Sequence, residues 1–138
     1  MNAVVKLCSA MAKPTRDSIS RLEDEMHKLP TITPHVDHVF AKGAYMRCIS
    51  MTKGTVITSK IHKTQHISVV VSGDVTISIP GETPKRVQGP TVFVTEAGTK
   101  RAIIVHEDTV WMTFHVTDET NLAKLEASII AKTYEEAE

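Results

Sequence analysis

The chain has 138 residues, of which 41% are hydrophobic and 23% are charged, with 16 basic and 16 acidic side chains. This length and composition are typical of a single globular domain and exclude a disordered chain. The balanced charge, without a long basic run, argues against a nucleic-acid-binding protein. The N-terminal apolar stretch is too short for a signal sequence or a membrane span, so we expect a cytoplasmic protein.

Residues 15–29 are predicted to form an amphipathic helix on the surface of a larger body. Apolar side chains recur there at spacings of three and four residues, which places them on one stripe. Thr15 or Asp17 is expected to cap the start of the helix, and Pro30 ends it. The members of the stripe are Ile19, Leu22, Met26 and Leu29.

Residues 35–117 change to short segments rich in Val, Ile and Thr, separated by turns with Gly, Pro and Asp. Glycine allows the positive φ that such turns need, and proline removes a hydrogen-bond donor of the ladder. Nine short strands without intervening helices must pair antiparallel, in a sandwich or a barrel. The expected strands are 35–40, 44–51, 55–60, 66–72, 74–79, 85–88, 91–95, 100–106 and 109–116.

Residues 119–134 are predicted to form a second helix, with Asp118 or Thr120 as its cap. Its apolar stripe consists of Leu122, Leu125 and Ile129. Because no repeat or linker divides the chain, residues 1–138 are expected to form one domain, mainly β, with an N-terminal and a C-terminal helix.

The last expected strand, 109–116, has two unlike faces because side chains alternate along a strand. One face is apolar, with Val110, Met112, Phe114 and Val116. The other face carries Trp111, Thr113 and His115, and in the strand 66–72 one face carries His66 and Ser68. We expect the mixed face to line a cavity. The alternative is a partly covered sheet surface or a subunit interface.

The segment from Gly54 to Gly73 has the spacing G-x7-H-x3-H-x6-G. It resembles the first motif of the cupin family, G-x5-H-x-H-x3,4-E-x6-G. When both glycines are aligned, Lys60 stands at the first histidine position, His62 at the second and His66 at the glutamate.

The segment that starts at Gly89 resembles the second cupin motif, G-x5-P-x-G-x2-H-x3-N, with one additional residue before Gly98. Gly98 is then retained, and Arg101 stands in place of the histidine. The resemblance covers roughly residues 40–116 and implies a single antiparallel β-barrel of the jelly-roll type. The ligand set of the family is not retained at these positions.

A closer resemblance covers about residues 15–130. The pieces "HVFAKGAYMR", "GTVITSKIHKTQH", "AGTKR" and "HEDTVWMTFHVTDET" are similar, in the same order, to those of small cupin-like proteins common in tailed-phage genomes. This resemblance implies a phage origin and the same fold, with the barrel at about 35–117. It implies no particular activity.

Two kinds of site are compatible with the residues in the two motifs. A divalent transition metal could bind His62 and His66, with a third nitrogen from His106, His115, His35 or His38. Lys60 and Arg101 are cations that cannot ligate a metal, and they attract an anion instead. The charges therefore favour a pocket for a small anionic or polar ligand, with Trp111 as a stacking wall. The third interpretation is that both histidines are hydrogen-bonded strand residues without a ligand.

Three other pairs of residues lead to further predictions. Tyr45 and Arg47 share a strand face and are expected either to enter the cavity or to pack. Glu107 and Asp108 are interpreted as an acidic turn between two strands, with acid–base chemistry as the less favoured alternative. Cys8 and Cys48 lack a CxxC spacing, which argues against thiolate zinc, and they are expected to stay reduced.

Three functions follow from these observations. The first is a binding protein for a small anion, which in a phage would sequester a host metabolite or signal. The second is a metal-dependent isomerase or oxygenase, and the third is a virion or assembly scaffold. Because small barrels leave sheet edges open, we also expect a dimer or larger homo-oligomer, with the segment before Pro14 as a possible edge strand.

Overall fold

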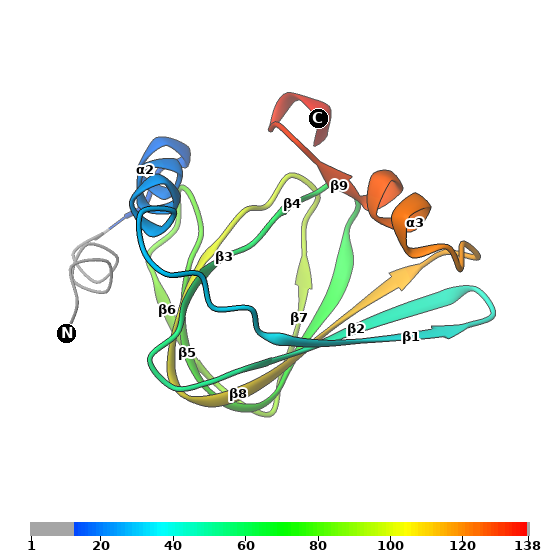
Figure 1. The fold of residues 1–138 in the computed structure, drawn as a ribbon, viewed down its shortest axis with the longest axis horizontal. Coiled ribbons are helices and arrows are strands. Elements are labelled where there is room, and N and C mark those ends of the chain that lie inside the picture. The colour runs from blue at the N-terminus through cyan, green and yellow to red at the C-terminus, as the bar shows by residue number, and fades with distance from the viewer. Residues whose placement is uncertain (1–12, 138) are drawn as a thin grey trace.

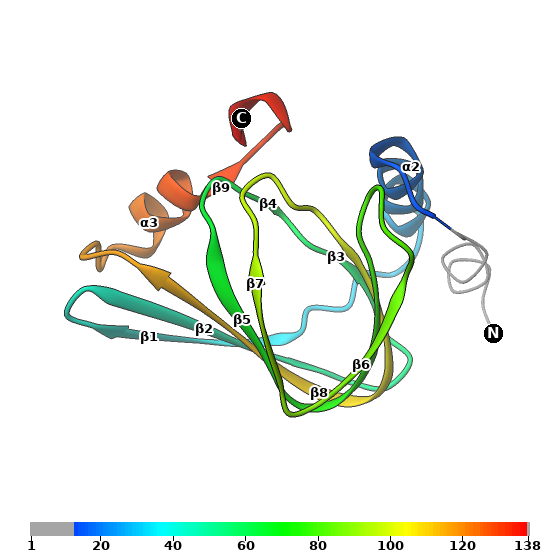
Figure 2. The same cartoon turned by 180° about the vertical axis from the view of Figure 1, so that it is seen from behind.

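The computed structural model describes residues 13–137 as a strongly curved antiparallel sheet with two helices (Figures 1 and 2). The predicted edge segment before Pro14, with Cys8, therefore lies almost wholly outside the described residues. In chain order the elements are α2 (Arg16–Met26), β1 (His35–Ala41), β2 (Ala44–Met51), β3 (Val56–Thr58), β4 (Ile61–His62), β5 (His66–Ser78), β6 (Lys85–Gln88), β7 (Thr91–Thr95), β8 (Ala102–Val116), α3 (Leu122–Ile129), β9 (Ile130–Ala131) and a 3-10 turn, η1 (Glu135–Ala137).

The strands β1-β2-β8-β5-β6 follow one another across the main sheet, with β3 paired to β8 and β7 paired to β5. A separate two-stranded sheet joins β4 to β9. This mainly β, jelly-roll-like arrangement with an N-terminal and a C-terminal helix confirms the expected fold class. The main sheet curves into a bowl without closing as a barrel (Figure 1).

Two of the predicted strand boundaries are wrong, because β5 and β8 each run through a position interpreted as a turn. Gly73 has φ 106° inside β5, and the pairing with β8 shifts register on both sides of it. The glycine therefore makes a bulge that bends a continuous strand. The sequence prediction also missed the short strands β4 and β9.

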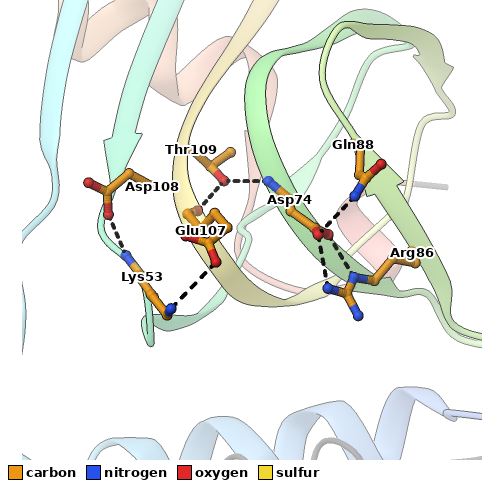
Figure 3. A network of polar contacts seen from close by, with 7 residues as sticks. All are labelled: Lys53, Asp74, Arg86, Gln88, Glu107, Asp108 and Thr109. Atoms are coloured by element: carbon orange, nitrogen blue, oxygen red, sulfur yellow. Dashed lines mark hydrogen bonds and ion pairs between the residues drawn. The ribbon is translucent and has the colours of Figure 1, made fainter.

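Glu107 and Asp108 correspondingly lie within β8 and do not form a turn between two strands. Both are exposed, and Lys53 contacts them: its Nζ lies 3.4 Å from Glu107 Oε1 and its backbone N–H donates to Asp108 Oδ1 at 2.8 Å (Figure 3). Neighbouring Asp74 accepts hydrogen bonds from Arg86 at 2.6 and 2.9 Å. Asp74 thus joins β5 to β6, and Glu107 and Asp108 bind the turn at Lys53 to β8.

The helix α2 begins at the predicted cap, since the Thr15 hydroxyl accepts a hydrogen bond from the backbone N–H of Ser18 at 3.0 Å. Its stripe residues Ile19 and Leu22 are fully buried, whereas Leu29 is exposed because the helix ends at Met26. The helix packs on outward-facing side chains of β8 and β3, in a cluster formed by Leu22, Ala102, Ile104, Met26 and Val56.

The helix α3 is shorter than predicted, and its cap is Asn121, whose side chain accepts from the Lys124 N–H at 3.1 Å. Leu125 and Ile129 pack against Tyr45 at the open side of the bowl. No helix in the described residues 13–137 is long and apolar enough to cross a membrane.

Candidate functional site

The concave face of the sheet surrounds a cavity of about 350 Å³, which is within the size range of small-molecule sites. The inward positions of β2, β5 and β8 meet there because the strands are paired in register. Tyr45 pairs with His115, Arg47 with Thr113 and Ile49 with Trp111. The mixed face predicted from alternation along residues 109–116 thus lines the cavity, whereas Phe114 and Val116 on the other face are exposed.

Three histidines converge at one end of this cavity. His66 starts β5, His115 lies near the end of β8, and His62 comes from β4. One ring nitrogen of each lies within 4.8 Å of the others, and the ring centroids of His66 are 4.5 and 4.6 Å from those of His62 and His115. His66 and His115 are only 5% and 4% exposed.

All three imidazoles are held in the neutral form. Burial, followed by the neighbouring His66, lowers the pKa of His62 to about 3 and that of His115 to about 4. Burial also lowers the pKa of His66, with a further effect from Arg101. Neutral imidazole is the form that ligates metals, because protonation removes the lone pair.

The hydrogen bonds leave acceptor nitrogens without partners. Nδ1 of His66 lies 3.2 Å from the carbonyl oxygen of Thr64, so this nitrogen donates and Nε2 carries the lone pair. Nδ1 of His62 and Nδ1 of His115 are buried and have no hydrogen-bond partner in the part of the chain that the structure describes. Three nitrogen donors without an acid in the cluster suit zinc, iron, nickel or copper better than magnesium or calcium. The residues present therefore fit a transition metal.

Arg101 lies beside this cluster and has no acidic partner among the described residues. It is 4% exposed, one of its terminal N–H groups donates to Thr95 Oγ1 at 2.8 Å, and its Nε is buried without a partner. The guanidinium carbon lies 5.4 Å from the Trp111 ring centroid. Burial lowers the pKa of Arg101 to about 10, so it remains charged at neutral pH. The cavity thus has a buried guanidinium that forms no ion pair with another described residue.

Every residue predicted for ligand binding lines this cavity, although their roles remain predictions. Lys60 is exposed, and Arg47 is half-buried. Tyr45 is buried, and its hydroxyl lies 2.7 Å from Nδ1 of His38. The full set is Tyr45, Arg47, Lys60, His62, His66, Arg101, Trp111 and His115.

The histidines predicted as a possible third metal ligand lie in different places in the structure. His115 lies with His62 and His66, whereas His106 does not line the cavity and its Nε2 lies 2.7 Å from the Thr76 hydroxyl. His35 is exposed beside Asp37, at 3.0 Å. Cys48 is half-buried, on the strand face opposite to Arg47 and Ile49, and does not line the cavity.

Sequence reasoning missed Glu126, the carboxylate of α3 that lines the same cavity. A signal was present, since Glu126 follows Leu122 by four residues and precedes Ile129 by three, which puts an acid on the apolar stripe. It also missed Thr95, whose hydroxyl bridges Arg101 and Ser68. That bridge joins distant strands and has no local pattern.

Solved structures with the same fold come from several organisms. An uncharacterised conserved protein with a double-stranded β-helix domain from Klebsiella pneumoniae has a TM-score of 0.55 at 14% identity, over 71% of this chain and 89% of that one. KdgF from Halomonas sp. has a TM-score of 0.53 at 16% identity, over 70% of this chain and 93% of that one. An RmlC-like cupin family protein from Methanocaldococcus jannaschii has a TM-score of 0.52 at 11% identity, over 62% of this chain and 82% of that one.

Neither a family model nor a curated protein matches the sequence. At these identities the structural likeness shows the fold alone, which is that of the RmlC-like cupins, the double-stranded β-helix. One fold of this kind serves many functions, so the function has to be argued from the cavity.

Proposed function

We propose that the protein binds a small organic carboxylate in the cavity of its cupin fold. The observation that supports this is Arg101, a buried guanidinium without an acidic partner in residues 13–137 and with an unbonded Nε beside the cavity. An unpaired buried charge destabilises a protein, and a ligand of opposite charge removes that penalty. The planar fork of arginine matches a carboxylate with two parallel hydrogen bonds.

The remaining lining supports an organic ligand over a free inorganic anion. Trp111, Ile49 and Ile103 line the cavity, and Phe93 packs edge to face on Trp111 with ring centroids 5.6 Å apart. Such a wall binds the apolar or planar part of a ligand, while Arg101 orients its charge.

A thermal-shift titration tests this proposal. Benzoate, lactate and malonate serve as carboxylate probes, with benzamide as the neutral analogue of benzoate and inorganic phosphate as the inorganic anion. At least one carboxylate should raise the Tm of the wild type, benzamide should not, and the shift should vanish in Arg101→Met. Equal shifts in wild type and Arg101→Met would refute the site.

The second candidate is metal-dependent catalysis, and the convergence of His62, His66 and His115 favours it. A transition metal on these imidazoles would supply a Lewis acid and open positions for ligand oxygen atoms. A bound carboxylate would also offset the charge of Arg101 near these imidazoles, so the two functions are compatible.

Elemental analysis of protein purified without added metal distinguishes the two candidates. A metal-dependent enzyme should retain a stoichiometric transition metal that His66→Ala loses. The matched control is His106→Ala, because His106 lies outside the cluster and should leave the metal content unchanged. A metal-free wild type that still binds carboxylates would leave only the binding function.

The finer prediction is that the protein sequesters a host metabolite or signal during phage infection. Mass spectrometry of the supernatant after denaturing freshly purified protein would identify a retained ligand. A scaffold without a ligand, the third hypothesis, instead predicts the chain in purified virions and no retained compound.

A further inference from the structure

The convex face of the sheet carries an apolar surface that no described part of the chain covers. It belongs to the strands β1, β2, β8, β5 and β7, on the side opposite to the cavity. In Figures 1 and 2 neither helix lies over this side. The pairing of the five strands aligns outward-facing residues in two rows, which are Val39–Met46–Phe114–Ile67–Val94 and Asp37–Cys48–Met112–Val69–Val92. We call these ten residues, together with Val116 on the same face of β8, the convex rows.

In the other half of the same sheet, a helix covers the apolar residues of the outer face. Ala102 and Ile104 also point outward from β8, but α2 covers them, and they are 0% and 6% exposed. Further along the same strand, Phe114 is 39% exposed and Val116 is 96% exposed. One strand therefore has a covered and an uncovered apolar stretch on its outer side.

The size of the uncovered surface is that of a protein interface. The exposed fractions of the six most exposed apolar residues on this face correspond to roughly 600 Å², at the upper end of the patch size usual for monomers and approaching the roughly 800 Å² that each partner of a standard interface buries. The half-buried members of the convex rows add to this area. The six residues are Val39 at 49%, Ile67 at 48%, Val92 at 67%, Val94 at 56%, Phe114 at 39% and Val116 at 96%.

We propose that a second copy of this chain packs on the convex rows, forming a two-fold symmetric dimer by face-to-face contact of the two sheets. A twisted sheet face with its apolar residues on both sides of a central strand, β8, is self-complementary. Asp37 is the one charged member of the convex rows and lies at the end of its row. A two-fold axis along β8 keeps the two Asp37 carboxylates at opposite ends of the interface.

Light scattering coupled to size-exclusion chromatography tests the dimer on the full chain. The wild type should have twice the chain mass of 15.2 kDa. Phe114→Asp and Val94→Asp should each weaken association at least tenfold and run as monomers, because each substitution places two charges in the apolar interface. The matched control is Ile32→Asp, an equally apolar residue that is 69% exposed outside the convex rows, and it should remain dimeric.

If Phe114→Asp does not fold, Val116→Asp replaces it, since this side chain is already 96% exposed in the single chain. A monomeric wild type overturns the proposal. A dimer that persists in both Val94→Asp and Val116→Asp also overturns it. Because none of these residues lines the cavity, the variants should keep carboxylate binding, so this result and that of the proposed function are independent.

Discussion

Replacing Arg101 by Met should stabilise the protein while abolishing its ligand binding. Methionine retains much of the length and apolar stem of the side chain but removes the charge. Arg101 has no acidic partner in the described residues, and its described side-chain hydrogen bond is to Thr95. The substitution therefore breaks no ion pair, and Thr95 keeps its 2.8 Å hydrogen bond with Ser68.

The magnitude follows from the pKa of Arg101. Burial lowers this pKa from 12.5 to about 10, and one pKa unit equals about 1.4 kcal/mol, so burying the charge costs the folded state about 3 kcal/mol. The lost hydrogen bond from a charged donor contributes about 1.5–3 kcal/mol in the other direction. The net gain is about 1 kcal/mol, which raises the Tm of a domain of this size by about 3 °C.

Differential scanning calorimetry without ligand measures this change, with Arg86→Met as the matched control. Arg86 donates to both carboxylate oxygens of Asp74, and this pair lowers the pKa of Asp74 to about 2 (Figure 3). Arg86→Met should therefore lower the Tm. If Arg101→Met lowers it as well, by several degrees, the charge of Arg101 is structural and the argument for a ligand site fails.

Two further predictions concern stability. Folding lowers the pKa of His62 from 6.5 to about 3 and that of His115 from 6.5 to about 4. As the pH falls, these histidines are therefore protonated in the unfolded chain before they are protonated in the folded protein. The stability is complete above pH 6.5 and should fall by about 1.4 kcal/mol per histidine per pH unit toward pH 5. Urea unfolding at pH 7 and pH 5 measures this loss, which should shrink in His115→Gln, and equal stability at both values would contradict it. Gly73→Ala should destabilise strongly in thermal melts, since its Cβ would lie 2.2 Å from Thr109 Oγ1, whereas Gly81→Ala, with φ 82° and no atom within 4 Å, should cost only about 1–2 kcal/mol. Equal losses in the two glycine variants would mean that the close approach at Gly73 is relieved by movement.

The sequence was most informative where the signal is local. The cap at Thr15 and the buried pair Ile19 and Leu22 follow from spacing within one helix. The inward face of Trp111 and His115 follows from alternation within one strand. Each of these features depends on neighbours in the chain, so no knowledge of the tertiary arrangement was needed.

The choice between His106 and His115 shows where this reasoning stops. Both lie on β8, at positions of opposite parity, so only one can face the cavity. From the sequence, the acidic pair at residues 107 and 108 is predicted to be a turn. Across a turn, the alternation of side chains no longer tells which residues on either side share a face. Only the continuous pairing of β8 with β5 restores it, and with it the approach of His115 to His66.

The two halves of the sheet differ in how many of their buried polar groups and apolar side chains lack a partner among the described residues. Where β5 and β8 continue past the bulge, Val75, Ile77 and Val105 pack into the main core, and α2 covers the outer side. The other half holds an unpaired guanidinium and two unbonded imidazole nitrogens inside, and an uncovered apolar face outside. Within residues 13–137, folding of one chain leaves all of these groups without a partner, and each is destabilising unless it gains one. A structure with a well-packed half and an unsatisfied half is therefore more consistent with a binding protein or enzyme than with a passive scaffold, because a scaffold gains nothing from an uncompensated charge in its interior.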